Sequence, residues 1–261
     1  MKMKMRNVIV AVGALLLLLL SYNAFAAPTG PGDVRKGAND KRVNGIDNTT
    51  GSSAIVQAQA GNVTNLNINS TRLTNRWQGY YGNVTGQITL DDANNNTLYD
   101  WAIASPQGEI YAANGTANGG IVTWASVFCF NYTNNLSDGG GARIQAFNGT
   151  DLERMIGATP TDSDSVNSTF NSTFVGTFQV GSVTINTASS CMSTHLYAND
   201  AAQQTRFTEV LLSDNQSIIY TAILEQSQAG FQGASVDFEM IVGDNGESVA
   251  TQPYYLFVEL S

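Results

Sequence analysis

The stretch Phe207-Thr-Glu-Val-Leu-Leu212-Ser213-Asp-Asn-Gln216-Ser217-Ile-Ile-Tyr-Thr-Ala-Ile-Leu224 contains two apolar runs on either side of four polar residues. Ser, Asp and Asn favour turns because their short side chains hydrogen-bond to the nearby backbone. The stretch therefore predicts a β-hairpin with strands over residues 207–212 and 217–224. Ile218, Ile219 and Tyr220 follow one another directly, which predicts a strand buried on both faces.

Apolar and polar residues alternate in several other segments, in the period of two that is typical of a strand. These segments are residues 65–69, 83–90, 99–103, 236–242 and 254–260. In the fourth of them Val236, Met240 and Val242 are expected on one face, with Asp237 and Glu239 on the other. Turn-forming residues stand between the segments, at 91–96, 105–108 and 244–246.

Few segments have a helical pattern. The best candidate is Asp151–Ile156, with Thr150 and Glu153 as a capping box and Gly157 as its end. A weaker candidate covers residues 200–204. Many short strands with one or two short helices predict an all-β fold, an antiparallel β-sandwich or jelly roll.

The repeat Asn167-Ser-Thr-Phe170-Asn171-Ser-Thr-Phe174 combines two properties. Each copy begins with Asn-x-Thr, the acceptor signal for N-glycosylation in a secreted chain. As a strand, the repeat would direct Asn167 and Asn171 to one face and Phe170 and Phe174 to the other. It thus predicts a glycosylated face opposite a core face.

The N-terminus has the pattern of a secretory signal peptide. Lys2, Lys4 and Arg6 precede an apolar run over residues 8–20, and Ala24-Phe25-Ala26 is a small-x-small cleavage site. The apolar run is shorter than the roughly 20 residues that a spanning helix needs. We expect residues 1–26 to be removed, with no membrane span afterwards, and the protein to be secreted, extracellular or at the cell surface.

Charge divides the remaining chain into an arm and a body. Loss of residues 1–26 removes three basic residues and no acidic one, so the net charge falls from −9 to −12. Residues 27–53 form a mildly basic, flexible N-terminal arm with Arg35, Lys36, Lys41 and Arg42. Residues 54–261 form a single β-sandwich domain that contains no lysine. This acidic body excludes nucleic-acid binding, which needs a basic face.

Glycosylation signals are more frequent than composition explains. Twelve are present, whereas chance would give about 5, so the excess predicts N-linked glycans. The predicted acceptors are Asn48, Asn62, Asn69, Asn83, Asn95, Asn114, Asn131, Asn135, Asn148, Asn167, Asn171 and Asn215. The other interpretation is that Asn and Thr are simply common in turns and on strand faces.

Two cysteines fall in the secreted part of the chain. Cys129 and Cys191 predict one disulfide in an oxidising compartment. The alternative combines Cys191 with His195, as metal ligands or as a thiol and its base. Two ligands are too few for a zinc site, and a disulfide leaves no thiolate.

The sequence contains little that indicates catalysis, and we expect that the protein is not an enzyme. The carboxylate pairs Asp91–Asp92 and Asp162–Asp164 lie in polar loops, where solvated turn residues are the usual interpretation. Residues 92–103 match the start of an EF-hand loop but lack its glycine and its final glutamate. No cofactor or metal is predicted, although calcium in a surface loop stays possible.

Three phrases carry a resemblance: Arg76-Trp-Gln-Gly-Tyr-Tyr-Gly-Asn-Val-Thr-Gly86, Ser165-Val-Asn-Ser-Thr-Phe170 and Tyr254-Tyr-Leu-Phe-Val-Glu259. With the signal peptide and dense sequons, the chain resembles secreted, heavily N-glycosylated surface proteins of archaea and related prokaryotes. More loosely, it is similar in plan to archaeal extracellular filament subunits, the threads and bundling pili. That resemblance implies a β domain that passes an N-terminal strand to the next subunit, and it implies no site residue.

An alternating apolar segment behind the arm suits this plan. It contains Ile55, Val56, Ala58 and Ala60, and could complete a sheet edge of the next copy or form the first strand of its own domain. We therefore expect a structural subunit of an extracellular filament or surface layer, with further copies of itself as head-to-tail partners. The alternatives are a carbohydrate-binding module or adhesin, with Trp77, Tyr80 and Tyr81 as a stacking platform, and a secreted hydrolase.

Overall fold

The computed structural model confirms the all-β fold: strands predominate, and α-helix is confined to two short segments of the described chain. The structure describes residues 28, 74–103, 106–114, 122–133, 148–245 and 251–260. The predicted signal peptide at 1–26, the arm at 27–53 apart from Pro28, and the segment with Ile55, Val56, Ala58 and Ala60 lie outside these ranges. So do Asn48, Asn62, Asn69 and Asn135. Within the described part, no helix is long and apolar enough to cross a membrane.

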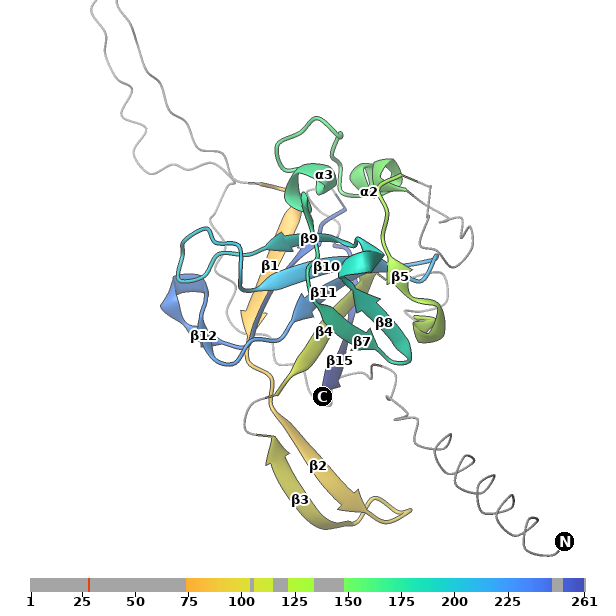
Figure 1. Cartoon of the computed structure of the whole chain (residues 1–261), viewed down its shortest axis with the longest axis vertical. Helices are drawn as coiled ribbons and strands as arrows, with labels where there is room; N and C mark the ends of the chain where they lie inside the picture. Colours follow the sequence, from red (N-terminus) through yellow and green to blue (C-terminus); the bar gives the residue numbers. More distant parts are fainter. Residues whose placement is uncertain are drawn as a thin grey trace, which may run out of the picture.

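A large antiparallel sheet forms the centre of the body (Figure 1). Its strands are β15 (Tyr254–Leu260), β4 (Gly108–Asn114), β11 (Ile218–Ile223), β10 (Thr208–Ser213), β9 (Met192–His195) and β6 (Ser172–Thr173), in that order. The short β5 (Phe128–Cys129) also pairs with β10. The predicted hairpin is confirmed as β10–β11, with Leu211 opposite Tyr220. Ile218, Ile219 and Tyr220 are all fully buried, as predicted.

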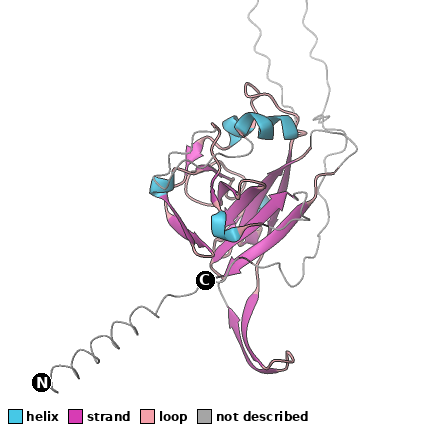
Figure 2. Ribbon diagram, turned by 90° about the vertical axis from the view of Figure 1, so that its right-hand side faces the viewer, coloured by secondary structure: helices cyan, strands magenta, loops and turns pink. Residues whose placement is uncertain are grey.

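Both faces of this sheet are covered, so the body has two apolar layers. One face, with Leu211, Tyr220 and Ala112, packs against the two helices and a ribbon of β1 (Trp77–Gly82) and β14 (Phe238–Gly243). The other face, with Leu212 and Ile219, packs against the hairpin of β7 (Thr177–Val180) and β8 (Val183–Asn186). Figure 2 shows the helices at one end of the strands. Short elements complete the fold: η1 (Trp124–Ser126), η2 (Thr187–Ser189), β12 (Gln228–Ala229), η3 (Phe231–Gly233) and β13 (Ser235–Val236).

The predicted helix at 151–156 is present as α2 (Gly149–Met155), but its cap differs from the prediction. Asn148 and Asp151 form the capping box, instead of Thr150 and Glu153, because the helix begins two residues earlier. Gly157 ends it with a φ of 68°, as expected of a C-terminal glycine. The weaker helix predicted at 200–204 is wrong: this segment is a turn closed by the isolated bridge between Ala198 and Ala201.

The repeat at 167–174 is not one strand, so this prediction is wrong for its first half. Residues Val166–Thr169 form a single helical turn, α3, capped by the side chain of Ser165. The buried carboxylate of Glu153 accepts hydrogen bonds from the backbone N–H of Val166 at 2.9 Å and of Asn167 at 3.1 Å. These bonds satisfy the free N–H groups of the turn, which a sequence period does not reveal. Phe170 and Phe174 are nevertheless buried.

The segment at 236–242 departs from its expected pattern at two acidic positions. Asp237 and Glu239 are buried, at 6% and 7% exposure, instead of lying on a solvent face. The Asp237 carboxylate accepts from the backbone N–H of Val84 and of Ser227, and Glu239 accepts from that of Phe231. Both carboxylates therefore act as acceptors for loops that cross the ribbon, which offsets the cost of their burial.

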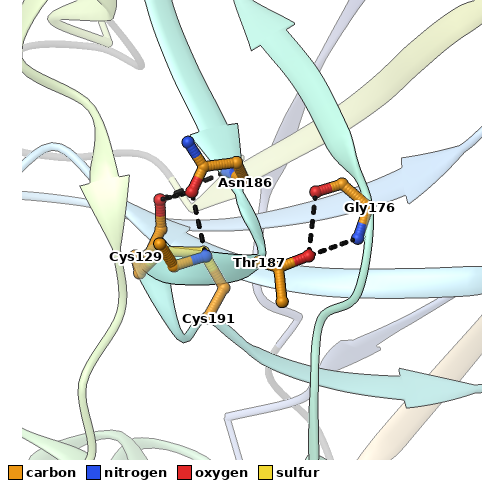
Figure 3. The surroundings of a disulfide bond; sticks show 7 residues. Cys129, Gly176, Asn186, Thr187 and Cys191 are labelled. Carbon is orange, nitrogen blue, oxygen red and sulfur yellow. Dashed lines mark hydrogen bonds between the residues drawn. A yellow bond between two sulfur atoms is a disulfide. The ribbon is translucent and has the colours of Figure 1, made fainter.

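The predicted disulfide is confirmed. Cys129 of β5 and Cys191, just before β9, are bonded with their Cα atoms 4.8 Å apart. Figure 3 shows the bond beside the turn at Asn186 and Thr187, where Thr187 Oγ1 accepts from the N–H of Gly176 at 3.0 Å. The disulfide thus joins β5 to the start of β9, and both of these strands pair with β10.

Candidate functional site

The most distinctive surface feature is a hairpin that projects from the body (Figures 1 and 2). It consists of β2 (Gly86–Asp91) and β3 (Thr97–Ile103), which pair only with each other among the described strands. Its base is anchored on β15: a Cβ on Gly86 would stand 3.2 Å from Ile103 Cδ1 and closer still to the Leu260 side chain. Beyond this base the two strands extend away from the core.

The register of the hairpin separates an apolar face from a polar one. Residues paired across an antiparallel ladder share a face, and the pairs Ile88–Trp101 and Leu90–Tyr99 alternate with Gln87–Ala102 and Thr89–Asp100. We call the first four residues, Ile88, Leu90, Tyr99 and Trp101, the apolar strip. The alternation predicted from sequence at 83–90 and 99–103 is thus confirmed.

The apolar strip is about half exposed to solvent. Ile88 is 58% exposed, Leu90 49%, Tyr99 59% and Trp101 48%, and Leu98 at the adjacent bulge is 82% exposed. The Tyr99 and Trp101 rings are in edge contact, with centroids 4.9 Å apart. A two-stranded hairpin is at best marginally stable alone in water, and the exposed aromatic pair is part of the apolar surface of this hairpin.

The tip of the hairpin is ordered by Asp92. Its Oδ1 accepts from the backbone N–H of Asn94 at 2.8 Å and of Asn96 at 2.9 Å, and its Oδ2 accepts from the Asn96 side chain. These hydrogen bonds, that from the Asn96 side chain above all, lower the pKa of Asp92. Asn95 adopts the left-handed φ of 63° that the turn requires. The Asp92 carboxylate, which begins the segment compared with an EF-hand loop, thus stabilises the turn itself.

The predicted aromatic platform is divided by the fold. Trp77 is half-buried against the first apolar layer, and its Nε1–H donates to the Asp164 carbonyl at 2.8 Å. Tyr80 and Tyr81 are exposed, at 47% and 45%. Tyr81 contacts the exposed ring of Phe231 with centroids 5.3 Å apart and planes inclined by 49°. A second, smaller aromatic patch is therefore Tyr81 with Phe231.

Neither predicted carboxylate pair forms an acid–base site. Asp162 forms an ion pair with Arg76 Nη2 at 2.9 Å, and Asp164 forms one with Arg76 Nη1. The hydrogen bond from the Thr159 N–H, and further the Arg76 charge, lower the pKa of Asp162. Together with the Trp77 bond, this pairing attaches the start of β1 to the loop before α3, which is a structural role.

A carboxyl pair that the sequence did not predict lies where β4 meets β15. Glu109 and Glu259 are direct cross-strand partners, and the Tyr111 hydroxyl donates to Glu259 Oε2 at 3.1 Å. Burial, and next the Glu259 charge, raise the pKa of Glu109 to about 8. The Gly181 N–H donates to both Glu259 oxygens, which attaches the β7–β8 turn to the pair.

Glu109 also lines a shallow depression with Arg206 and Glu225. Arg206 and Glu225 form an ion pair at 3.2 Å. A neutral carboxyl near an ionised one is the pattern of a glycoside-cleaving site, but here the carboxylate of Glu225 is paired with a cation. Within the described ranges, no group of three or more His, Cys, Asp and Glu side chains is placed to hold a metal.

His195 does not form a site with Cys191, since Cys191 is in the disulfide. It lies at the end of β9, half-buried, with Nδ1 3.1 Å from Thr208 Oγ1 on the neighbouring strand. Its role is that of a cross-strand partner.

The predicted glycan acceptors in the described ranges differ in exposure. Asn83, Asn95, Asn167 and Asn171 are exposed, whereas Asn131, Asn148 and Asn215 are half-buried. Asn114 is buried at 8% exposure, and its Oδ1 accepts from the Ile218 N–H at 2.8 Å. This position argues against a glycan on Asn114 in the folded protein.

Replacement of Asn114 by Ala tests that structural role. In protein from a host without the glycosyltransferase, we expect the variant to lose about 1–3 kcal/mol of unfolding free energy, because the buried Ile218 N–H loses its acceptor. Denaturant unfolding measures this, with Asn83→Ala at an exposed acceptor expected within about 0.5 kcal/mol of the parent. Equal stabilities of both variants would contradict the assignment.

Comparison of the chain with protein families, curated proteins and solved structures finds no match.

Proposed function

We propose that the protein is a secreted glycoprotein that serves as a structural subunit of an extracellular filament or surface layer. The observation that carries this proposal is the apolar strip on the projecting β2–β3 hairpin, which is about half exposed to solvent. Removal of such a patch from water by another molecule is favourable, and patches of this size often mark interaction sites. A subunit that meets its neighbours through a projecting arm has such a surface.

Three further features support the proposal. The disulfide is compatible with an oxidising, extracytoplasmic compartment. Exposed sequons at Asn167 and Asn171 lie on the body, at α3 and next to β6, whereas the exposed sequon at Asn95 lies in the turn of the hairpin itself. The N-terminal segment with Ile55 and Val56 would supply strand exchange between successive copies as a second contact.

The assembly state of the glycosylated protein tests this function. We expect concentration-dependent assembly by sedimentation velocity, and regular polymers in negative-stain electron microscopy. A variant with Ile88→Lys and Trp101→Lys should assemble about 100-fold less readily, because two charges on the apolar strip would have to be desolvated.

The hairpin offers a matched control for that variant. Gln87→Lys with Ala102→Lys adds the same charges at the neighbouring cross-strand pair, but on the polar face. This control should assemble as the parent does. A parent protein that stays monomeric up to high concentration, with its glycans confirmed by mass, would contradict the proposed function.

A second candidate function is carbohydrate binding, which the exposed contact of Tyr81 and Phe231 favours. Stacking on sugars uses exposed aromatic faces, but these two rings are inclined by 49° instead of forming one flat platform. Glycan binding that is lost in Tyr81→Ala and kept in Trp101→Ala would favour this function.

A further inference from the structure

We propose that two copies of the chain pack the apolar strips of their β2–β3 hairpins against each other about a two-fold axis. This inference rests on the proposed self-assembly and specifies the partner surface. It differs from the head-to-tail contact expected from the sequence, because here the same residues meet on both sides. Three observations favour this partner: the area of the strip, the charge of the hairpin, and the pairing of the arginines on the body.

The area of the strip matches what a small self-association needs. The four side chains of the strip, each about 200 Å² and about half exposed, leave roughly 400 Å² in contact with solvent. Two copies would remove about 800 Å² from water, which is within the range of weak contacts and below the roughly 1,000 Å² of a stable specific interface. Such a contact is of modest affinity by itself and would be strengthened by the other contacts of an assembly.

Charge favours contact between two apolar strips over contact with the body. The hairpin carries Asp91, Asp92 and Asp100, and no Lys or Arg occurs between residues 77 and 142. Asp100 lies on the polar face opposite Thr89, and the Thr89 hydroxyl donates to Asp91 at 2.9 Å, so both acids point away from the strip. Two strips can therefore meet without bringing these charges together.

A body surface of another copy offers this acidic hairpin no free cation among the described residues. Arg76 is paired with Asp162 and Asp164, Arg154 with Asp151 at 3.1 Å, and Arg206 with Glu225. The net charge of the chain, −9, adds repulsion between bodies. Because the hairpins project beyond the bodies (Figure 2), two of them can meet while the bodies stay apart.

A two-fold contact between hairpins limits how an assembly of this protein can grow. An interface that uses the same patch on both subunits closes upon itself and yields a pair, not a fibre. Growth of a filament or layer would then require the second contact, for which the N-terminal segment is the candidate. The building block of the assembly would be a two-fold pair of chains.

Mixing experiments distinguish this contact from a head-to-tail one. Ile88→Lys with Trp101→Lys and Ile88→Glu with Trp101→Glu are purified separately from a glycosylating host, and the parent serves as a third protein. Each variant alone should self-associate about 100-fold more weakly than the parent. Mixed together, the Lys and Glu variants should form a hetero-pair, because opposite charges then face each other across the two-fold axis. Sedimentation velocity with one labelled partner measures this.

The controls separate failure of the inference from failure of the proposed function. Parent protein that binds the Lys variant as tightly as it binds itself would overturn the two-fold contact, since the parent hairpin would then be docking on an unaltered body; assembly itself would remain. Parent protein that does not associate at all would overturn both. Unchanged thermal unfolding of each variant, relative to Gln87→Lys with Ala102→Lys, shows that the body is intact.

Discussion

Replacing Cys129 and Cys191 together by alanine is expected to lower the free energy of unfolding by about 4 kcal/mol. The reason is the length of the loop that the bond closes, since the two cysteines are 62 residues apart in sequence. Without the bond, the unfolded chain gains the conformational freedom of that loop. The bond also joins β5 to the start of β9, two strands that are otherwise linked through their pairing with β10. Denaturant unfolding of parent and variant measures the difference.

Packing must be separated from cross-linking in this experiment. Val127 lies in the same apolar layer at 2% exposure, and Val127→Ala should cost about 1–3 kcal/mol through the cavity alone. That variant should still lose a further 4 kcal/mol or so on reduction, whereas the double cysteine variant should be insensitive to reductant. A double variant as stable as the oxidised parent would refute the role of the cross-link.

Elements with a strong local pattern were predictable from the sequence. The hairpin at 207–224 followed from two apolar runs around a turn, and the continuous run at Ile218–Tyr220 correctly indicated burial on both faces. The disulfide followed from the number of cysteines. The hairpin depends on neighbouring residues and the disulfide on the presence of only two cysteines, so neither required knowledge of the tertiary structure.

Central strand β4 was missed for a physical reason. Its residues Glu109-Ile-Tyr-Ala-Ala113 do not alternate between apolar and polar, because the two apolar layers bury both of its faces. Alanine has little preference for strands, and Glu109 is a residue normally found outside. Only the neighbouring strands make this segment a strand, so the carboxyl pair with Glu259 could not be predicted either.

The candidate site, the apolar strip, could also be predicted from the sequence only in part. Alternation at 83–90 and 99–103 correctly predicted which side chains share a face. It could not predict whether that face would be covered, because the residue pattern of an apolar face is the same in a core strand and in a projecting hairpin. Exposure of Tyr99 and Trp101 is a property of the whole fold. Tertiary hydrogen bonds likewise decided the burial of Asp237 and Glu239.

Glu109 gives the second large expected effect, a stability that depends on pH. Its pKa is raised from 4.5 to about 8, chiefly by burial and then by the Glu259 charge. Between these values the unfolded chain has released the proton and the folded chain retains it, so folding takes up a proton. The stability is therefore complete below about pH 4.5, declines as the pH rises, and levels off above about pH 8.

Replacing Glu109 by Gln should remove the contribution of this carboxyl to the decline, because the amide is neutral at every pH. We expect parent and variant to be about equally stable at pH 4.5 and the variant to be more stable at pH 8, by at most about 5 kcal/mol. The comparison needs denaturant unfolding at both pH values.

Glu225→Gln is the matched control, since it removes a carboxylate from the same depression but leaves the buried pair with Glu259 in place. The control should retain the slope of the parent between pH 4.5 and 8. A Glu109→Gln variant with that same slope would show that another group takes up the proton, with the buried Glu209, whose pKa burial also raises, as the next carboxyl to replace.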